Sequence, residues 1–558
     1  MAENFVETWR ARGVAEIPVH YRHFRELLAV AEDHLRRGRY DMAAVSAAIA
    51  ARHACSGHAG IFVSHDLERL LTELAEDALP PLACLPAGAA ERQAERVLHV
   101  ATEIGAVGGL SRMLHRWIVH DVERQHSIAL TSQSTRAIPI SLSQALANQG
   151  GEIHFLDGVV GGLVARAAQL RRIASSFDYV VLHIAAGDVV AFLAFAGNHT
   201  YPPVIFVNHA DHQFWLGSSV SNIVANLRRS GDQLSRQRRG IVPERNMLLP
   251  TLICASDRVV SREKAKYKLG LPENSLVMLS VARSIKYQSV GHETYAGVHV
   301  PVLQRYPGAI LVVVGAGVRP EWDEAKQTCR GRIISLEERQ NVEEYFQAAD
   351  VYVDSFPFVS ITSLLEAGTF GVPLVTRFPY SAASSILGAD MPGLDGNLVV
   401  TRSAGEYQDQ LCRLLDQETE RERIGNAIRK DILNHHCGAS WQLALEAIYE
   451  RARTLGPIHC SADTIEAPYL GEPDVFIQSV FGGTYDRERC RDRLIEDELG
   501  VMPAPDRFKH WVSLRGRRSG PSGRWGSAVQ LLPHWLRSRV GRWRRSFGRE
   551  RLSFAGRR

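Results

Sequence analysis

The stretch Ala348–Thr376, "AADVYVDSFPFVSITSLLEAGTFGVPLVT", predicts a strand, a short loop and the start of a helix. The apolar run "VYV" ends at Asp354, and the helix that follows the loop contains Glu366. Its opening residues carry hydroxyls: Ser360, Thr362 and Ser363. Because the first helical turn leaves backbone N–H groups without partners, such a start is suited to an anion such as a diphosphate. Glu366, one turn further in, can reach ribose hydroxyls. The alternative is a hydroxyl cap followed by a solvated glutamate.

Strand-like and helix-like runs alternate on both sides of this stretch. The apolar runs include "RVLHVAT", "HSIALTS", "YVVLHIA" and "PVIFVNHA" after Arg96, and then "LVMLSVA", "AILVVVGAG" and "GRIISL". Such alternation indicates parallel sheets with right-handed crossovers. A polar interval at 230–244 separates two groups of strands. We therefore expect an α/β chain with two Rossmann-like domains that face a cleft, and ligand-binding residues just after the strands.

The order "D-x-F-P…T-x-x-x-E…G-V-P-x-V-T" in the first stretch resembles the donor-site signature of GT-B glycosyltransferases, of the group 1 type with some O-GlcNAc-transferase-like character. The resemblance covers about residues 277–450. It implies the GT-B fold, a nucleotide-diphosphate-sugar donor and no metal or other cofactor. Two positions depart from the family pattern. Phe358 stands where group 1 retaining enzymes carry a second glutamate, and Ser360-Ile361 stands where the O-GlcNAc-transferase-like pattern has Gly-His. The stereochemical outcome therefore stays open.

Two cations follow another strand of the same half of the chain. In "LSVARSIKYQS" the strand ends and Arg283 and Lys286 come next. They resemble the pair of cations that holds the donor diphosphate in the family. Cations at this place would stabilise the charge that builds up on a leaving nucleoside diphosphate. The alternative for the pair is a solvated surface position.

A glycine-rich loop lies in the first half of the chain. In "VATEIGAVGGLSRMLHRWI" three glycines, Gly105, Gly108 and Gly109, stand between a strand and a helix, where a missing Cβ lets backbone approach a ligand. The loop resembles the N-terminal glycine-rich loop of the family, although strand-glycine-helix is also common packing. A dinucleotide fingerprint is absent. Arg112 and His115 on the next helix are either cleft-facing or at the surface.

Three titratable side chains end the strand in "VIFVNHADHQFWLG", namely His209, Asp211 and His212. By strand alternation His209 and Asp211 would point into the cleft and His212 to the opposite face. A neutral histidine oriented by a carboxylate suits a general base that deprotonates an acceptor hydroxyl, with His212 as a further orienting or donor-contacting group. Histidines satisfied by backbone are the alternative. A metal site from the three is disfavoured by their geometry. His183 and Asp188 are secondary candidates.

The composition is that of an ordinary globular protein, with 45% hydrophobic and 23% charged residues among 558. At roughly 100–200 residues per domain this length predicts about three domains. The eight cysteines lack a C-x-x-C pair, so we expect reduced thiols. No apolar run reaches the length of a membrane span, and the start of the chain has no signal-peptide core. These features predict a cytoplasmic protein.

The N-terminal region is expected to be helical. "YRHFRELLAVAEDHLRR" and "DMAAVSAAIAARHA" have helical spacing and are separated by the turn-like "GRY", which is similar to a single tetratricopeptide-type hairpin. We therefore divide the chain into a helical region at 1–92, an acceptor domain at 93–250, a donor domain at 251–455 and an extension at 456–558.

The basic charge is confined to the end of the chain. Residues 515–558 contain 13 arginines and one acid, Glu550, so this tail carries +12 and the remainder about −8. Its segment "LLPHWLRSRVGRWRRSF" places Leu532, Leu536, Val540, Trp543 and Phe547 at helical spacing among arginines. That pattern is typical of an interfacial helix on anionic lipid. A disordered tail or a helix docked on the body are the alternatives. Nucleic-acid binding is disfavoured, since no recognition module is present.

Together these features predict a transferase that moves a sugar from a nucleotide-diphosphate-sugar donor to a hydroxyl acceptor. The acceptor would be a glycan, a lipid-linked group or a protein, with bacterial cell-envelope polysaccharide or lipopolysaccharide assembly as the expected setting at the inner membrane face. Two alternatives remain. One is a nucleotide-sugar epimerase or hydrolase on the same fold, and the other is a catalytically silent scaffold.

Overall fold

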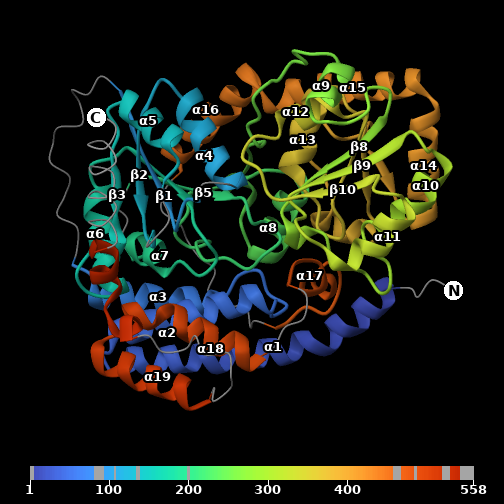
Figure 1. Cartoon of the computed structure of the whole chain (residues 1–558). Helices are drawn as coiled ribbons and strands as arrows, with labels where there is room; N and C mark the ends of the chain where they lie inside the picture. The colour runs from blue at the N-terminus through green and yellow to red at the C-terminus, as the bar shows by residue number, and fades with distance from the viewer. Residues whose placement is uncertain are drawn as a thin grey trace, which may run out of the picture.

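The computed structural model describes residues 5–80, 94–105, 108–133, 138–197, 202–455, 467–482, 487–517 and 528–540. Two parallel sheets lie side by side, and a layer of helices runs beneath them (Figure 1). The α/β fold of two Rossmann-like domains with a helical N-terminal region is therefore confirmed.

The first sheet has seven strands in the order β3-β2-β1-β4-β5-β6-β7, all parallel. Their bounds are β1 Arg96–Ala101, β2 Gln125–Leu130, β3 Ile153–Phe155, β4 Tyr179–His183, β5 Val204–Asn208, β6 Ile223–Asn226 and β7 Asn246–Leu248. The helices that connect them are α4 Gly109–His120, α5 Ile140–Asn148, α6 Leu163–Ala174, α7 Val189–Phe195 and α8 Arg229–Arg239. The short strands β3, β6 and β7 were not expected, because each is a run of three or four residues that includes a His or an Asn.

The second sheet has six strands in the order β10-β9-β8-β11-β12-β13. Their bounds are β8 Leu276–Val281, β9 Ala309–Val314, β10 Ile333–Leu336, β11 Val351–Val353, β12 Leu374–Arg377 and β13 Val399–Thr401. Its helices are α9 Arg262–Lys268, α10 Val300–Arg305, α11 Asp323–Thr328, α12 Glu343–Ala348, α13 Ile361–Thr369, α14 Ala404–Asp416 and α15 Glu418–His436. Here every strand before β13 coincides with an apolar run of the sequence.

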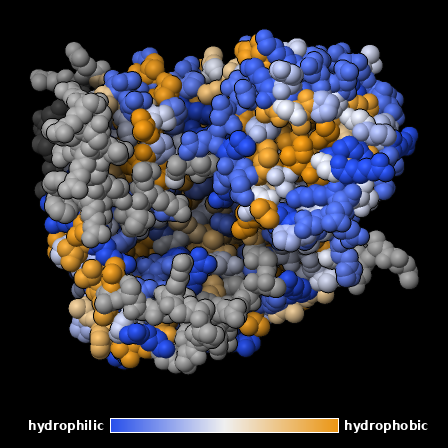
Figure 2. Space-filling model, in the orientation of Figure 1, coloured by the Kyte–Doolittle hydropathy of each residue, from blue (hydrophilic) through white to orange (hydrophobic). Residues whose placement is uncertain are grey.

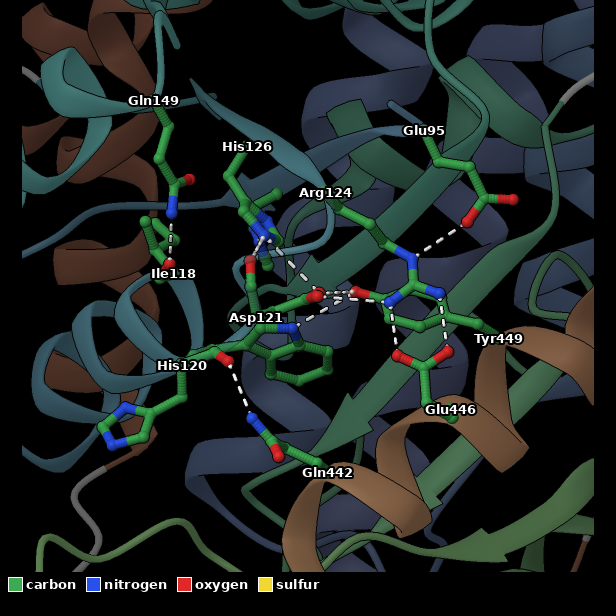
Figure 3. Close-up of polar contacts among 12 residues, drawn as sticks. Glu95, Ile118, His120, Asp121, Arg124, His126, Gln149, Gln442, Glu446 and Tyr449 are labelled. Atoms are coloured by element: carbon green, nitrogen blue, oxygen red, sulfur yellow. Dashed lines mark hydrogen bonds and ion pairs between the residues drawn. The ribbon is translucent and has the colours of Figure 1, made fainter. Parts of the chain in front are cut away.

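The next helix, α16 (Gly438–Thr454), crosses back to the first domain. Its apolar face, with Trp441 and Tyr449, packs on Trp117 and Tyr179. Polar contacts also hold α16 to the first domain (Figure 3). Arg124 donates through Nη1 and Nη2 to the two carboxylate oxygens of Glu446, each at 2.7 Å. The interval 251–455 thus includes a helix whose packing partner is the first sheet, so α16 links the two domains.

The N-terminal hairpin consists of α1 (Phe5–Arg36) and α2 (Tyr40–Ser56), and Gly38 turns the chain at φ +67. The prediction of a helical hairpin is confirmed, with α1 beginning earlier than expected. One end of α1 packs on the second domain through Phe5 and Phe356, and its other half packs on the first through Phe24 and Phe214. The hairpin therefore spans both domains beneath the sheets (Figure 1).

A buried carboxylate ties this region to the first domain. Glu68, on α3 (His65–Ala78), accepts hydrogen bonds from the backbone N–H groups of Gly217, Ser218 and Ser219 at 2.7–2.9 Å. The Ser218 hydroxyl adds a fourth bond at 2.7 Å. Such a buried acid is stable only with its acceptors satisfied, so the helical layer is an integral part of the fold.

The extension after α16 returns beneath the molecule. It contains α17 (Asp474–Ile477), a π-helix at Gln478–Gly482, α18 (Arg487–Glu498) and α19 (Ala504–Arg517). Helix α18 packs against α2. Within the described residues no helix is long and apolar enough to cross a bilayer.

Candidate functional site

A cavity of about 950 Å³ lies between the two domains and is lined by both. A space-filling view shows the molecule hollowed between its lobes (Figure 2). Ten of the residues that we selected from the sequence line the cavity, and Glu366 does not: Gly108, Gly109, His209, Asp211, His212, Arg283, Lys286, Ser360, Thr362 and Ser363. Residues far apart in the chain therefore meet at one place.

The start of α13 forms one wall of the cavity. Ser360 is the N-cap residue, but its hydroxyl bonds to Ser363 Oγ at 3.2 Å and makes no bond to a helix N–H group. The loop before it is held by the Asp354 carboxylate, which accepts from the N–H groups of Ser355 and Ser360 at 2.8 and 2.9 Å. Burial raises the pKa of Asp354 to about 6. The hydroxyl-capping alternative is thus not what this helix start shows.

The two cations lie beside that helix start. Lys286 donates to the carbonyl of Val359 at 2.8 Å, and its ammonium lies 4.2 Å from the centre of the Phe358 ring. Burial lowers the pKa of Lys286 to about 8, although the nearby Asp354 opposes this shift. Arg283 is exposed and lines both this cavity and an adjoining one. This wall therefore combines positive charge with a helix N-terminus.

Glu366 does not point into the cavity. Its carboxylate bonds to the arginines of α4 in the other domain: Arg112 Nη1 is 2.9 Å from both oxygens, and Arg116 Nη2 is 2.7 Å from Oε1. The carboxylate is 12% exposed, against 41% for Arg112 and 13% for Arg116. The alternative of a solvated glutamate is wrong, because α4 supplies two charge-assisted partners from the facing domain.

The glycine-rich loop faces the same wall. Gly108 has φ +146, a conformation that L side chains rarely adopt, and α4 starts at Gly109. A Cβ at Gly109 would lie 3.4 Å from Thr362 Oγ1, so the two domains approach closely here. Gly105 also lines the cavity.

His209 lies on the opposite wall, directly after β5. Its Nδ1 is 3.1 Å from the carbonyl of Val207. Since a carbonyl only accepts, Nδ1 carries the proton and Nε2 of the neutral ring keeps its lone pair. Burial lowers the pKa of His209 below its ordinary value. The ring is therefore neutral near pH 7 and oriented by backbone, and not by Asp211 as we expected.

Asp211 is bound to an arginine that the sequence did not single out. Arg228 donates to its two oxygens at 2.6 and 2.8 Å, and His212 Nδ1 lies 3.3 Å away. Burial opposes ionisation of Asp211, but the ion pair with Arg228 holds its pKa well below the usual range. Arg228 also donates to the carbonyls of Ile386 and Gly388 in the second domain. Asp211 thus belongs to an ion pair within the first domain, whose arginine also bonds to the second domain.

His209 and Asp211 line the cavity as expected, but the predicted opposite orientation of His212 is wrong. Strand β5 ends at Asn208, and residues 209–212 form a turn, so the two-residue period of a strand does not apply. His212 lines the same cavity as His209 and Asp211. Its ring stacks on Phe481 with centroids 4.0 Å apart.

The secondary candidates have structural partners. His183 is fully buried and bonds through Nε2 to His99 at 3.0 Å. Asp188 caps α7 and accepts from the hydroxyls of Thr102 and Thr131. His115 does not line the cavity, whereas Arg112 does. In the part of the chain that the structure describes, no group of three or more His, Cys, Asp or Glu is arranged to hold a metal ion.

The described part of the basic tail contacts the body. His534 Nδ1 accepts from Arg166 at 2.9 Å, and Arg539 donates to the carbonyl of Gly158 at 3.0 Å. Leu532 and Val540 remain exposed. Trp543 and Phe547, which complete the expected apolar stripe, lie outside the described residues.

Three residues of this site were missed at the sequence level: Arg116, Arg228 and Phe481. Arg116 lies one helical turn after Arg112, so the spacing of α4 offered a signal for it. Arg228 follows the unexpected strand β6, and a correct strand there would have pointed to it. Phe481 comes from the extension, and no pattern in the neighbouring sequence indicated that it lies at the site.

No protein-family model matches the chain, and no curated protein matches it. Solved structures that resemble it include glycosyltransferases. A glycosyltransferase from Rickettsia africae shares 11% identity over 65% of this chain and 100% of that chain, with a TM-score of 0.49. Anabaena HepE in complex with UDP shares 14% sequence identity over 64% of this chain and 100% of the HepE chain, with a TM-score of 0.48. The O-GlcNAc transferase of Thermobaculum terrenum shares 14% sequence identity over 78% of this chain and 84% of the transferase chain, with a TM-score of 0.44.

Proposed function

We propose that this chain is a glycosyltransferase that moves a sugar from a nucleotide-diphosphate-sugar donor to a hydroxyl acceptor. One observation carries the proposal: a cationic helix start and a neutral histidine face each other across one interdomain cavity. Group transfer from a phosphate leaving group needs this pair of functions, one for the departing anion and one for the attacking hydroxyl.

The diphosphate would bind at the start of α13. Backbone N–H groups of the first turn, the hydroxyls of Thr362 and Ser363, and the charges of Arg283 and Lys286 all suit an anion there. Gly108 and Gly109 would let the backbone of the facing domain approach the same group. As the bond to the sugar breaks, this wall would stabilise the negative charge of the leaving nucleoside diphosphate.

His209 would act as the general base. Its Nε2 lone pair is available because Nδ1 donates to the Val207 carbonyl. In the reaction the acceptor oxygen forms a bond to the anomeric carbon of the sugar, its proton passes to Nε2, and the bond to the diphosphate oxygen breaks. His212 and Asp211 would shape the acceptor side, with Asp211 neutralised by Arg228.

Glu366 would contact the ribose of the donor. Its present partners are Arg112, which lines the cavity, and Arg116, so donor binding would exchange or share these contacts. Arg112, being the more exposed arginine, is the one that a ligand can displace at lower cost.

The acceptor would be a glycan, a lipid-linked group or a protein hydroxyl in cell-envelope polysaccharide or lipopolysaccharide assembly. The 515–558 tail, with 13 arginines and one acid, would hold the enzyme at the anionic inner face of the membrane. Sedimentation with vesicles containing anionic lipid tests this part, with neutral vesicles as the control. Equal binding to both would contradict an electrostatic anchor.

The first experiment is a thermal-shift screen of the full chain against nucleoside diphosphates and nucleotide sugars, because a ligand of the folded state raises Tm by mass action. We expect one base to raise Tm, and Lys286→Ala to abolish the shift. Lys430→Ala, at an exposed position on α15, is the matched control. The shift and sugar transfer should persist with EDTA, since the scheme uses no metal. No shift with any nucleotide would favour a binding scaffold instead.

A further inference from the structure

The C-terminal extension supplies a wall of the cavity through Phe481. This residue lies in the π-helix at Gln478–Gly482 that follows α17. Its ring lines the interdomain cavity and also the adjoining pocket of about 1010 Å³ next to Arg283 and Gly317. The extension is therefore part of the cleft and not only a cover on the outside of the molecule.

Phe481 completes an aromatic cluster of three rings from three separate segments. His212 stacks on it at 4.0 Å with an interplanar angle of 29°, and Phe358 meets it edge-on at 4.3 Å and 88°. The ammonium of Lys286 lies 4.2 Å from the centre of the Phe358 ring. An apolar surface thus connects the turn that carries His209 with the cation beside α13.

The segment that carries Phe481 makes polar contacts with the helical layer and with both domains. The buried carboxylate of Asp474 accepts from Arg238 at 2.6 and 2.9 Å and contacts His58 Nε2 at 3.0 Å. Glu472, just before it, bonds to Arg10 and to Ser384 of the second domain. Gln288 then donates to the carbonyl of Val480 at 3.1 Å. These contacts hold the segment to the helical layer and both domains, so the ring is positioned before any ligand binds.

The position of the cluster indicates what it contacts. In the proposed reaction the transferred sugar must lie between the base, His209, and the diphosphate site at Lys286. The aromatic cluster occupies one side of that space. A hexopyranose presents C–H groups on its ring faces, and these pack favourably on aromatic surfaces, whereas its hydroxyls need polar partners at the edges.

We propose that Phe481 is a specificity-determining residue that forms, with Phe358, the apolar wall against which the sugar of the donor packs. The inference rests on the proposed function and adds the sugar subsite to it. The ring also packs against a hydrophobic cluster that includes Val480 and Phe476. Discrimination among sugars would follow from which ring face is free of axial hydroxyls.

The test separates the sugar from the nucleotide. Titration calorimetry measures Kd for the nucleoside diphosphate found in the screen and for the matching nucleotide sugar, with wild type, Phe481→Ala and Phe481→Leu. We expect Kd of the nucleotide sugar to rise about five- to tenfold in Phe481→Ala and Kd of the nucleoside diphosphate to stay within twofold. Phe481→Leu keeps apolar volume without a flat face, so a smaller loss confined to the sugar conjugate is expected.

Phe508→Ala is the matched control, since Phe508 is an exposed phenylalanine on α19 of the same extension and does not line the cleft. If the Phe481 variants weaken both ligands equally, the ring only supports the shape of the cleft and the proposal is overturned. Unchanged affinity for both ligands also overturns it. If Phe481→Ala fails to fold, the Phe481→Leu comparison decides. A wild-type chain that binds neither ligand would instead refute the proposed function.

Discussion

Glu366 and Arg112 meet across the interdomain cleft, with Arg112 Nη1 2.9 Å from each carboxylate oxygen. The pair joins α13 of one domain to α4 of the other, and Arg116 adds a third bond at 2.7 Å. The carboxylate that the sequence assigned to a ligand is therefore also a domain contact. Each of these two roles can be measured separately.

Glu366→Ala should destabilise the fold in the absence of ligand. Its removal leaves Arg116, which is 13% exposed, without its carboxylate, and we expect a loss of about 2 kcal/mol in the free energy of unfolding. Urea denaturation measures it. Glu422→Ala, at an exposed position on α15, is the control and should change little. Equal stability of the two variants would show that the contact contributes nothing.

The ribose role of Glu366 predicts a ligand-dependent effect. Glu366→Ala should weaken nucleoside diphosphate binding about tenfold, the loss of one charge-assisted hydrogen bond, and should leave inorganic pyrophosphate binding unchanged. Calorimetry with the two ligands checks this. A parallel loss for pyrophosphate would mean that Glu366 acts on the phosphate site through Arg112.

Lys286 predicts a pH dependence of donor binding. Burial lowers its pKa to about 8, so the ammonium is charged below that pH and is lost as pH rises through it. Kd for the nucleoside diphosphate should rise as pH increases from 7, where its terminal phosphate is already ionised, to above 8. Lys286→Arg keeps its charge throughout this range. The affinity of Lys286→Arg for the nucleoside diphosphate should therefore not decrease above pH 8. A decrease of the same size in both proteins would assign the titration to another group.

His209→Ala should reduce kcat by about 10²- to 10⁴-fold with donor Kd unchanged, since a general base acts on the attacking hydroxyl. Burial lowers the pKa of His209, so the neutral form is already present at pH 6.5 and kcat/KM should fall only on the acid side of that value. His435→Ala, on the exposed face of α15, is the matched control. If kcat/KM of His209→Ala still decreased at acid pH as in the wild type, the general base would be another group.

Asp211→Asn should act on stability more than on chemistry. It removes the nearer carboxylate partner of the buried Arg228 and leaves Asp390, at 3.2 Å, as the other, which costs about 2 kcal/mol in the free energy of unfolding. The folded pKa of Asp211 is lowered, so this stabilisation is present above the unfolded pKa and is lost as pH falls through the folded one. Chemical denaturation at pH 7 measures the first effect, and a series of measurements at decreasing pH below 4 measures the second. Unchanged stability with slower turnover would restore Asp211 as the partner of a catalytic histidine.

The sequence by itself determined the two parallel sheets and which residues stand at the ends of their strands. An apolar run of five or six residues, such as β5 or β9, encodes a buried strand locally, and the residue after it must lie at the carboxyl edge of the sheet. This is why ten of the selected residues reached one cavity. The short strands β3 and β6 were not predicted, because each is a run of three or four residues that includes a His or an Asn.

The tertiary structure alone decided what each of those residues contacts. Spacing along a strand or helix fixes which face a side chain shares with its neighbours, but a partner 254 residues away, as Arg112 is from Glu366, depends on how two domains pack. The same holds for Phe481, which the fold of the extension brings to His212. The turn at 209–212 also replaced strand alternation, and the partner of Asp211 is Arg228, which follows another strand of the sheet.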